Sequence, residues 1–196
     1  MNIRIAQVKE NTQAEGPGNR FALWVQGCSI RCTNCCNPEM FKQSGGQQTS
    51  TSNIIQQIKS TPNIEGISIL GGEPLDQIDA TLDICKQAKA LNLSVMLYTG
   101  YTLEEIKIKF PSRLSEIMTY IDLIVDGRYE HTKPERTRRW VGSSNQIMHF
   151  LSNRYQQSDP QFYVSNTVEI SFNKNTKVIT VNGFPHQQLF QLRKAI

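Results

Sequence analysis

Long apolar runs are absent from this sequence of 196 residues. No stretch approaches the roughly 18 consecutive apolar residues that a membrane-spanning helix needs. The first ten residues, MNIRIAQVKE, also lack the apolar core of a secretory signal peptide. We therefore expect a cytoplasmic protein that neither spans nor binds a membrane.

The chain also lacks a large excess of charge of either sign. The chain has 21 basic and 17 acidic residues, a formal net charge of +4, and no long block of like charge. This balance does not favour nucleic acid as a partner. The most basic stretch, residues 133–139, is either a solvated loop, which is the commoner case, or a surface for an acidic partner. The length suits one domain with a substantial core.

Cysteines are few and strongly clustered. The chain has five, and four of them lie within the nine residues from Cys28 to Cys36. An odd number in so tight a cluster does not fit a secreted disulfide framework. A reducing compartment and a metal site fit better.

Strand and helix patterns alternate through the first two thirds of the chain. Alternating or continuous apolar runs predict strands at five places, residues 2–8, 21–25, 66–70, 94–98 and 123–125. Periods of three and four predict helices between them, one capped by Ser52, one over residues 75–91, one opened by the capping box of Thr102 and Glu105, and one from Pro111 to Ile121. This alternation indicates an α/β fold with a parallel sheet and right-handed crossovers.

Four residues that can carry chemistry follow the ends of successive predicted strands. They are Cys28, Gly71, Thr99 and Asp126. In α/β sheets and barrels the carboxyl edge of the strands is where ligands bind. The pattern lapses after Trp140, and residues 167–183 read as a β-hairpin turning at Lys174-Asn175, an appendage to the main sheet.

The strongest chemical signal is the loop with Cys28, Cys32 and Cys35, spaced by four and three residues. Thiolates so close together can hold one soft metal centre. A ferredoxin cluster needs four cysteines, and structural zinc usually needs four Cys or His ligands. Three cysteines in register indicate a cluster with one iron open to another ligand. The alternatives are a zinc knuckle and incidental buried thiols.

This CxxxCxxC loop resembles that of radical S-adenosylmethionine (SAM) enzymes, and further motifs follow in order. Residues 15–20 (EGPGNR) and 24–28 (WVQGC) resemble the N-terminal segment of glycyl-radical-enzyme activating proteins. Gly71-Gly72-Glu73-Pro74 resembles the motif that contacts the amino group of the methionine moiety. Residues 98–105, 125–128 and 140–146 resemble the activating proteins of anaerobic ribonucleotide reductases. The resemblance covers roughly residues 11–146.

The resemblance implies a fold and a reaction. The fold is an incomplete parallel β/α barrel of the radical SAM type, with a core over residues 1–154 and a C-terminal β-hairpin extension of the same domain over 155–196. One [4Fe–4S] cluster on Cys28, Cys32 and Cys35 would reductively cleave SAM to methionine and a 5′-deoxyadenosyl radical. That radical would install a glycyl radical on a partner enzyme, with anaerobic ribonucleotide reductase expected. The electron donor would be of the flavodoxin or ferredoxin type.

The expected SAM site combines residue chemistry with the resemblance. Glu73 would accept a charge-assisted hydrogen bond from the ligand's ammonium group, and glycines at 71 and 72 allow close backbone approach. The resemblance adds four further residues, Pro74, Thr99, Asp126 and Arg128. Arg128 suits the ligand's carboxylate, whereas Asp126 could alternatively cap the next turn. No catalytic side chain is expected beyond the cluster and SAM.

Two cysteines stand outside the expected ligand set. Cys85 lies on an apolar helical stripe and is expected in the core. Cys36 occupies a position that is usually aromatic in the family, and it is interpreted as a small buried residue beside the cluster or as an alternative ligand. Other functions stay open as well. They are radical modification of a different peptide or small molecule, which the hairpin could help to recognise, and a non-catalytic iron–sulfur electron carrier or zinc-binding module.

Overall fold

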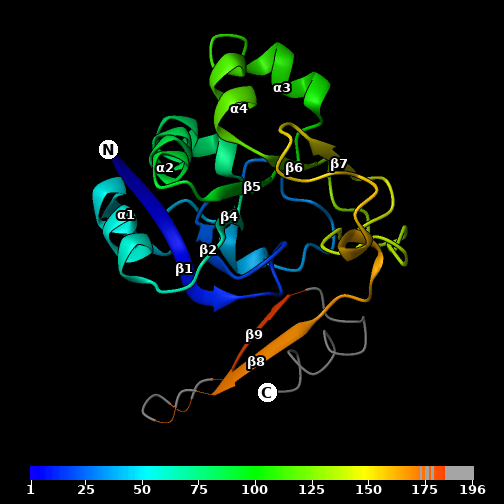
Figure 1. Cartoon of the computed structure of the whole chain (residues 1–196), viewed down its shortest axis with the longest axis horizontal. Helices are drawn as coiled ribbons and strands as arrows, with labels where there is room; N and C mark the ends of the chain where they lie inside the picture. Colours follow the sequence, from blue (N-terminus) through cyan, green and yellow to red (C-terminus); the bar gives the residue numbers. More distant parts are fainter. Residues whose placement is uncertain (173, 175–176, 178, 184–196) are drawn as a thin grey trace.

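The computed structural model describes residues 1–172, 174, 177 and 179–183. Its centre is a seven-stranded mixed sheet in the order β3-β1-β2-β4-β5-β6-β7 (Figure 1). The strands are β1 (Asn2–Thr12), β2 (Arg20–Val25), β3 (Gln47–Ser50), β4 (Gly66–Gly71), β5 (Ser94–Tyr98), β6 (Leu123–Asp126) and β7 (Ile147–Phe150). The four central strands β2, β4, β5 and β6 run parallel, and β1, β3 and β7 pair antiparallel outside them.

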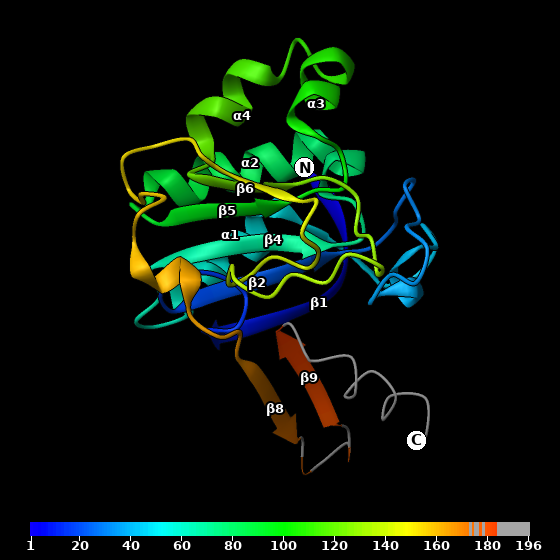
Figure 2. The same ribbon diagram turned by 90° about the vertical axis from the view of Figure 1, so that its right-hand side faces the viewer.

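Helices cover one side of this sheet. They are α1 (Thr51–Ser60), α2 (Ile78–Ala90), α3 (Leu103–Lys109) and α4 (Leu114–Tyr120). Figure 2 shows α2, α3 and α4 stacked on the same side of the strands. The apolar stripe of α2 packs with buried sheet residues in the main core. Cys85 belongs to this stripe and is fully buried, as the sequence predicts.

The other side of the sheet carries a second apolar cluster. Trp140 and Phe162 lie at its centre, with ring centroids 5.6 Å apart in an edge-to-face arrangement. Phe162 comes from the short 3-10 helix η3 (Pro160–Tyr163). The chain after β6 is thereby held against the sheet, although its sequence shows no regular period.

Every predicted strand of the alternating region is confirmed, but several boundaries and two further strands were not predicted. The sequence predicts no strand between residues 25 and 66, yet β3 lies there and pairs with β1. β3 has the sequence QQTS, and its backbone pairing needs no apolar alternation. β7 was missed too, because it pairs at the opposite edge, where burial is only partial.

Helix starts also differ from expectation. Ser50, not Ser52, caps α1, because the Ser50 hydroxyl accepts from Asn53 N at 3.1 Å. The helix expected over residues 75–91 is divided into the 3-10 helix η2 (Pro74–Gln77) and α2. Pro111 lies in a turn, and α4 begins three residues later, at Leu114. The capping box of Thr102 and Glu105 at α3 is confirmed.

The C-terminal hairpin consists of β8 (Val168–Phe172) and β9 (Ile179–Gly183). It forms a separate two-stranded sheet that projects beside β1, on the side away from α3 and α4 (Figure 2). The hairpin was predicted, but Asn175 of its expected turn lies outside the described residues. Within the part of the chain that the structure describes, no helix has the length and apolar character to cross a membrane.

Candidate functional site

The carboxyl ends of the four parallel strands meet at one edge of the sheet. β2 ends three residues before Cys28, β4 ends at Gly71, β5 ends just before Thr99, and β6 ends at Asp126. These strands are direct neighbours in this order. The structure therefore gathers the four strand ends that the sequence singled out, at the edge where α/β folds bind ligands.

Backbone hydrogen bonds join the chain after β4 to the chain that leads into the cysteine loop. The amide of Gly72 donates to Val25 O, and the amide of Glu73 donates to Gly27 O, both at 2.8 Å. A Cβ on Gly72 would lie 2.1 Å from Gly27 O, so only glycine fits there. The sequence suggested that this glycine makes room for a ligand, but the backbone it admits is that of the cysteine loop itself.

A second clamp on the cysteine loop comes from η2. The carboxylate of Asp76 accepts hydrogen bonds from the amide of Ser29 at 2.7 Å and from its hydroxyl at 2.8 Å. Ser29 directly follows Cys28, so this contact fixes the first cysteine against the turn after β4. Sequence reasoning missed Asp76. Its only signal was its position three residues after Glu73, in the turn that Pro74 begins.

The loop itself is tightly folded around the thiols. Arg31 and Asn34 both have positive φ, 52° and 56°, which turns the chain sharply between the cysteines. Backbone amides approach two sulfurs, since Arg31 N lies 3.5 Å from Cys28 Sγ and Asn37 N lies 3.4 Å from Cys35 Sγ. Such N–H contacts stabilise thiolates, and they tune the sulfurs of iron–sulfur sites.

The fourth cysteine of the cluster, Cys36, contacts its neighbour. A hydrogen bond from the Cys36 thiol lowers the pKa of Cys35 to about 7, and the same bond holds the pKa of Cys36 well above its usual value. Burial raises the pKa values of Cys28 and Cys32. Cys36 is exposed, so the expectation of a buried small residue is wrong. It instead faces a cavity.

The donor set of this loop suits an iron–sulfur cluster. Three thiols are soft ligands of the kind that such clusters require, and all three line one cavity. Among the described residues, no three His, Cys, Asp or Glu side chains are gathered around a single point as one metal ion would need. Each thiolate of a [4Fe–4S] cluster binds a different iron, so its ligands stand further apart than those of one ion.

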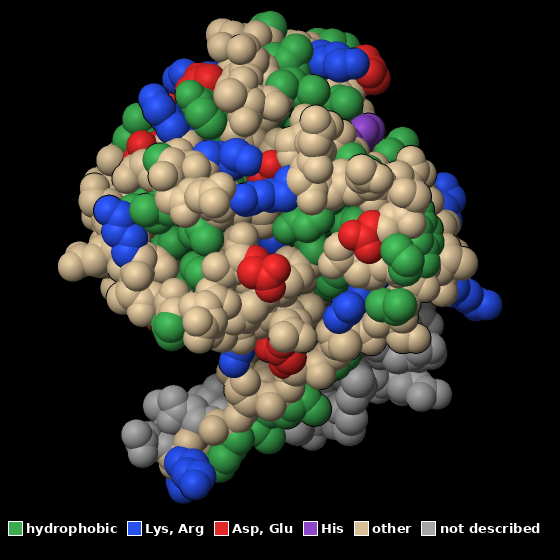
Figure 3. Space-filling model, in the orientation of Figure 1, with side chains coloured by type: hydrophobic (Ala, Val, Ile, Leu, Met, Phe, Trp, Pro, Cys, Tyr) green, Lys and Arg blue, Asp and Glu red, His purple; other side chains and the backbone are tan. Residues whose placement is uncertain are grey.

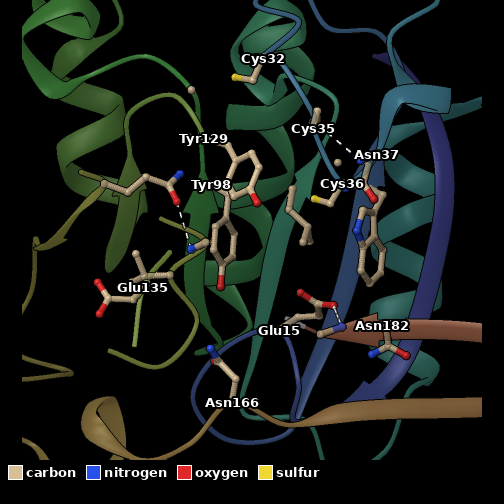
Figure 4. Close-up of a pocket in the computed structure, with 18 of the residues that line it drawn as sticks. Glu15, Cys32, Cys35, Cys36, Asn37, Tyr98, Tyr129, Glu135, Asn166 and Asn182 are labelled. Atoms are coloured by element: carbon tan, nitrogen blue, oxygen red, sulfur yellow. Dashed lines mark hydrogen bonds between the residues drawn. The ribbon is translucent and has the colours of Figure 1, made fainter. Parts of the chain in front are cut away.

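The cavity has a volume of about 1000 Å³. Figure 4 shows Cys32, Cys35 and Cys36 at one end, Glu15 and Asn182 at the other, and Tyr98 and Tyr129 between them. Gly72, Glu73 and Thr99 contribute to the wall from the strand ends. This volume lies at the upper end of the range for small-molecule sites, so the cavity has room for more than one reactant.

Glu73 is buried in the cavity wall with its carboxylate held from three sides. Oε1 accepts from Leu75 N at 2.9 Å and from the Thr99 hydroxyl at 2.8 Å, and Oε2 accepts from Gly100 N at 2.9 Å. Burial raises the pKa of Glu73 to about 7, although these donors oppose the increase. A carboxylate oxygen can accept two hydrogen bonds, so Oε2 retains capacity for a further donor.

Glu15 forms part of the opposite end of the cavity. Its side chain is buried, and Oε1 accepts from the amide of Gly183 in β9 at 2.6 Å. Burial raises the pKa of this carboxyl to about 8. The sequence placed Glu15 in a family motif but gave it no role. Its burial depends on the hairpin and could not be read from the motif.

The other expected cofactor residues lie beside the cavity wall. Pro74 is buried and starts η2. The Asp126 carboxylate accepts from Leu103 N at 2.6 Å and lies 2.9 Å from His149 Nε2. Arg128 pairs with Glu105 at 2.8 Å. Within residues 125–128, Gly127 lines the cavity. Asp126 and Arg128 instead contact protein groups.

The basic stretch at residues 133–139 lies beside the same cavity. Arg138 pairs with Glu135, and Lys133 pairs with Glu130. Arg139 stacks on the Trp140 ring at 4.4 Å from its centroid. Most of this charge is therefore neutralised or packed locally, and the exposed Arg136 contributes to the cavity lining.

Known proteins match most of this chain. The model of the family described as "4Fe-4S single cluster domain" matches residues 14–149. The anaerobic ribonucleoside-triphosphate reductase-activating proteins of Pasteurella multocida (strain Pm70) and Vibrio cholerae serotype O1 are each 32% identical over 142 residues, covering 68% of this chain and 89% of theirs. The protein of the same name from Enterobacteria phage T4 is 33% identical over 139 residues, covering 67% and 83%.

Among solved structures, QueE from Escherichia coli aligns with a TM-score of 0.44 and 18% identity, over 52% of this chain and 54% of that one. The sequence matches confirm the resemblance drawn from the cysteine loop and the motifs that follow it. This chain belongs to the family described as 4Fe–4S single cluster domain, and it is related in sequence to the anaerobic ribonucleoside-triphosphate reductase-activating proteins.

Proposed function

We propose that this chain is a radical SAM activating enzyme. It holds one [4Fe–4S] cluster through Cys28, Cys32 and Cys35, cleaves SAM reductively, and installs a glycyl radical on an anaerobic ribonucleoside-triphosphate reductase. The observation that carries the proposal is the single cavity that three thiols and the turn after β4 share. The names of the sequence relatives support the same reaction and partner.

The cysteine loop would hold the cluster, and the backbone pairing with residues 72–73 and the Asp76 clamp would keep the loop in place. When bound, the cluster supplies the electron that cleaves the bond between sulfur and C5′ of SAM. With three thiols engaged, a cluster bound here would lack a fourth protein ligand, and the amino and carboxylate groups of SAM would take that place.

Glu73 would bind the ammonium group of SAM. Its free acceptor capacity on Oε2 and its position in the cavity wall support this role. An ammonium ion beside the carboxylate favours the ionised form of Glu73, opposing the effect of burial. Thr99 and Gly100 orient the carboxylate.

Most of the remaining expected residues would affect SAM binding indirectly, by shaping the backbone around the site. Gly71 and Gly72 set the path of the turn, and Pro74 starts η2. Asp126 fixes the start of α3 through Leu103 N. Arg128 would reach the ligand's carboxylate only by leaving Glu105. The parallel strands would form the incomplete barrel of the radical SAM type, with the hairpin as an extension of the same domain.

A polypeptide is the substrate that best suits the cavity. A cofactor of the size of SAM would occupy part of about 1000 Å³, and the remainder would admit a loop of a partner protein carrying the target glycine. An electron donor of the flavodoxin or ferredoxin type would reduce the cluster.

The test is anaerobic reconstitution with iron and sulfide, followed by addition of a reductant and SAM. We expect a brown protein with about four irons per chain that forms 5′-deoxyadenosine. With the cognate reductase present, electron paramagnetic resonance should show a glycyl radical on that protein. A chain that binds only zinc, or that holds iron but leaves SAM intact, would refute the proposal in favour of an interaction module or an electron carrier.

A further inference from the structure

The β8–β9 hairpin has two faces of opposite character. Directly paired residues share a face, and the pairs are Val168 with Gly183, Ile170 with Val181, and Phe172 with Ile179 on one side. Glu169 with Asn182 and Ser171 with Thr180 form the other side. One face is therefore apolar and free of charge, and the other is polar.

The polar face is the one that contacts the body of the protein. Lys9 Nζ donates to Ser171 Oγ at 2.8 Å, and Gln13 N donates to Glu169 Oε1 at 2.8 Å. Asn182 is 4% exposed, and its Nδ2 donates to Thr12 Oγ1 at 3.0 Å. The hairpin is thus anchored to β1 and the segment after it through hydrogen bonds, with its polar side inward.

The apolar face points outward, the reverse of the usual arrangement in a sheet packed on a core. Ile170 is 66% exposed, Phe172 is 55% exposed and Ile179 is 57% exposed. We call these three residues the apolar strip. Figure 3 shows hydrophobic side chains along the projecting hairpin. Contiguous exposed apolar residues of this kind mark interaction surfaces.

The apolar strip continues into the cavity. Val168 and Val181 lie on the same face of the hairpin as the strip, and both line the cavity wall, together with Val164 before β8. A molecule seated on the strip would therefore also stand at the side of the cavity. The match to the family model ends at residue 149, so this surface lies outside the matched region.

We propose that the apolar strip is the docking surface for the radical acceptor protein, which lays an apolar segment on Ile170, Phe172 and Ile179 while its target loop enters the cavity. This inference rests on the proposed function. The continuity of strip and cavity selects this occupant, because the acceptor is the partner that must reach the cavity.

The test compares two reconstituted full-length variants. Ile170→Thr/Phe172→Thr/Ile179→Thr removes the apolar strip with residues that suit a strand. The control, Ile108→Gln/Met118→Gln, removes exposed apolar residues from α3 and α4, on the far side of the sheet. The probe is the anaerobic ribonucleoside-triphosphate reductase of the same organism, and the readouts are its Kd, the glycyl radical yield, and 5′-deoxyadenosine formed without the reductase.

We expect the strip variant to bind the reductase at least about tenfold more weakly and to lose radical yield in proportion, while it cleaves SAM alone as wild type does. The control should match wild type in all three readouts. Unchanged reductase affinity in the strip variant overturns the docking surface and leaves the proposed function standing. A variant that loses only self-association has the same consequence, and it would assign the strip to a second copy of the chain. A wild-type chain that cleaves SAM without binding the reductase overturns both the partner and the strip.

Discussion

The hydroxyl of Thr99 donates a 2.8 Å hydrogen bond to Oε1 of Glu73. This contact links the residue after β5 to the turn after β4, two positions that are 26 residues apart in the chain. Because Leu75 N and Gly100 N bind the same carboxylate, its orientation is fixed by both strand ends. The carboxylate is thus set by protein contacts alone.

Glu73→Ala is expected to retain the cluster and to weaken SAM binding. The change removes a charged hydrogen-bond acceptor, which contributes about 1.5–3 kcal/mol, without touching a thiol. The measurement is anaerobic titration of the loaded protein with SAM. Glu116→Ala, at a half-buried carboxylate on α4 that pairs with Arg113, serves as the control and should leave the affinity unchanged. Equal affinities for wild type and Glu73→Ala would remove Glu73 from the site.

Removal of Cys28, Cys32 or Cys35 by substitution with Ala is expected to abolish most iron binding and all SAM cleavage, because each supplies one thiolate. Cys36→Ala should keep both, although it loses the contact with Cys35. Cys85→Ala should cost on the order of 1 kcal/mol of stability and leave the iron content intact, since Cys85 only packs in the core. A brown Cys35→Ala protein beside a bleached Cys36→Ala protein would shift the ligand assignment by one residue.

Asp76→Asn is expected to loosen the cysteine loop. The amide keeps one acceptor oxygen, but it loses the charge that strengthens both hydrogen bonds from Ser29. We expect faster loss of iron to a chelator, by roughly tenfold for a change of about 1.4 kcal/mol. Asp79→Asn, three residues on and paired with Arg113 at the surface, is the matched control. Chelation rates that are the same in all three proteins would show that the clamp is dispensable.

The raised pKa of Glu15 predicts how the stability of the metal-free chain depends on pH. Its pKa is raised from 4.5 to about 8 in the fold, so the folded state holds a proton that the unfolded state has released between these values. Stability should therefore fall as pH rises through this window, by on the order of 3–5 kcal/mol at about 1.4 kcal/mol per pH unit. Glu15→Gln keeps an acceptor for Gly183 N and should flatten this part of the profile.

The measurement is urea unfolding of the reduced, metal-free chain at several pH values from 5 to 8.5. The pKa of Glu73 is also raised, to about 7. Its ionisation should lower the free energy of unfolding with rising pH in the same way, but this effect ends at a lower pH than that of Glu15. The difference between wild type and Glu15→Gln isolates the contribution of Glu15. Two parallel stability profiles would contradict the assigned burial of this carboxyl.

The sequence predicted the parallel core because buried strands such as β4 appear as continuous apolar runs bounded by glycine. It missed β3, since an edge strand that pairs through its backbone can consist of polar residues. It placed the start of α1 two residues late, because Ser50 and Ser52 are equally good caps and only the folded chain shows which hydroxyl accepts from Asn53.

The candidate site was predicted as far as topology fixes it. Parallel neighbours bring their carboxyl ends together, so the proximity of Cys28, Gly71 and Thr99 followed from the alternation of strands and helices. The contacts of Asp76 with Ser29 and of Glu15 with Gly183 did not follow. They join side chains to backbone groups 47 and 168 residues away, and no local pattern encodes such distances.

The amides of Gly72 and Glu73, which donate to Val25 O and Gly27 O, extend the ladder between β2 and β4 past the end of the sheet. The residue before Cys28 is therefore held by the same backbone ladder that aligns the two central strands. A change that separates β2 from β4 would displace the first thiol together with the strands, so the position of Cys28 and the pairing of the sheet cannot vary independently.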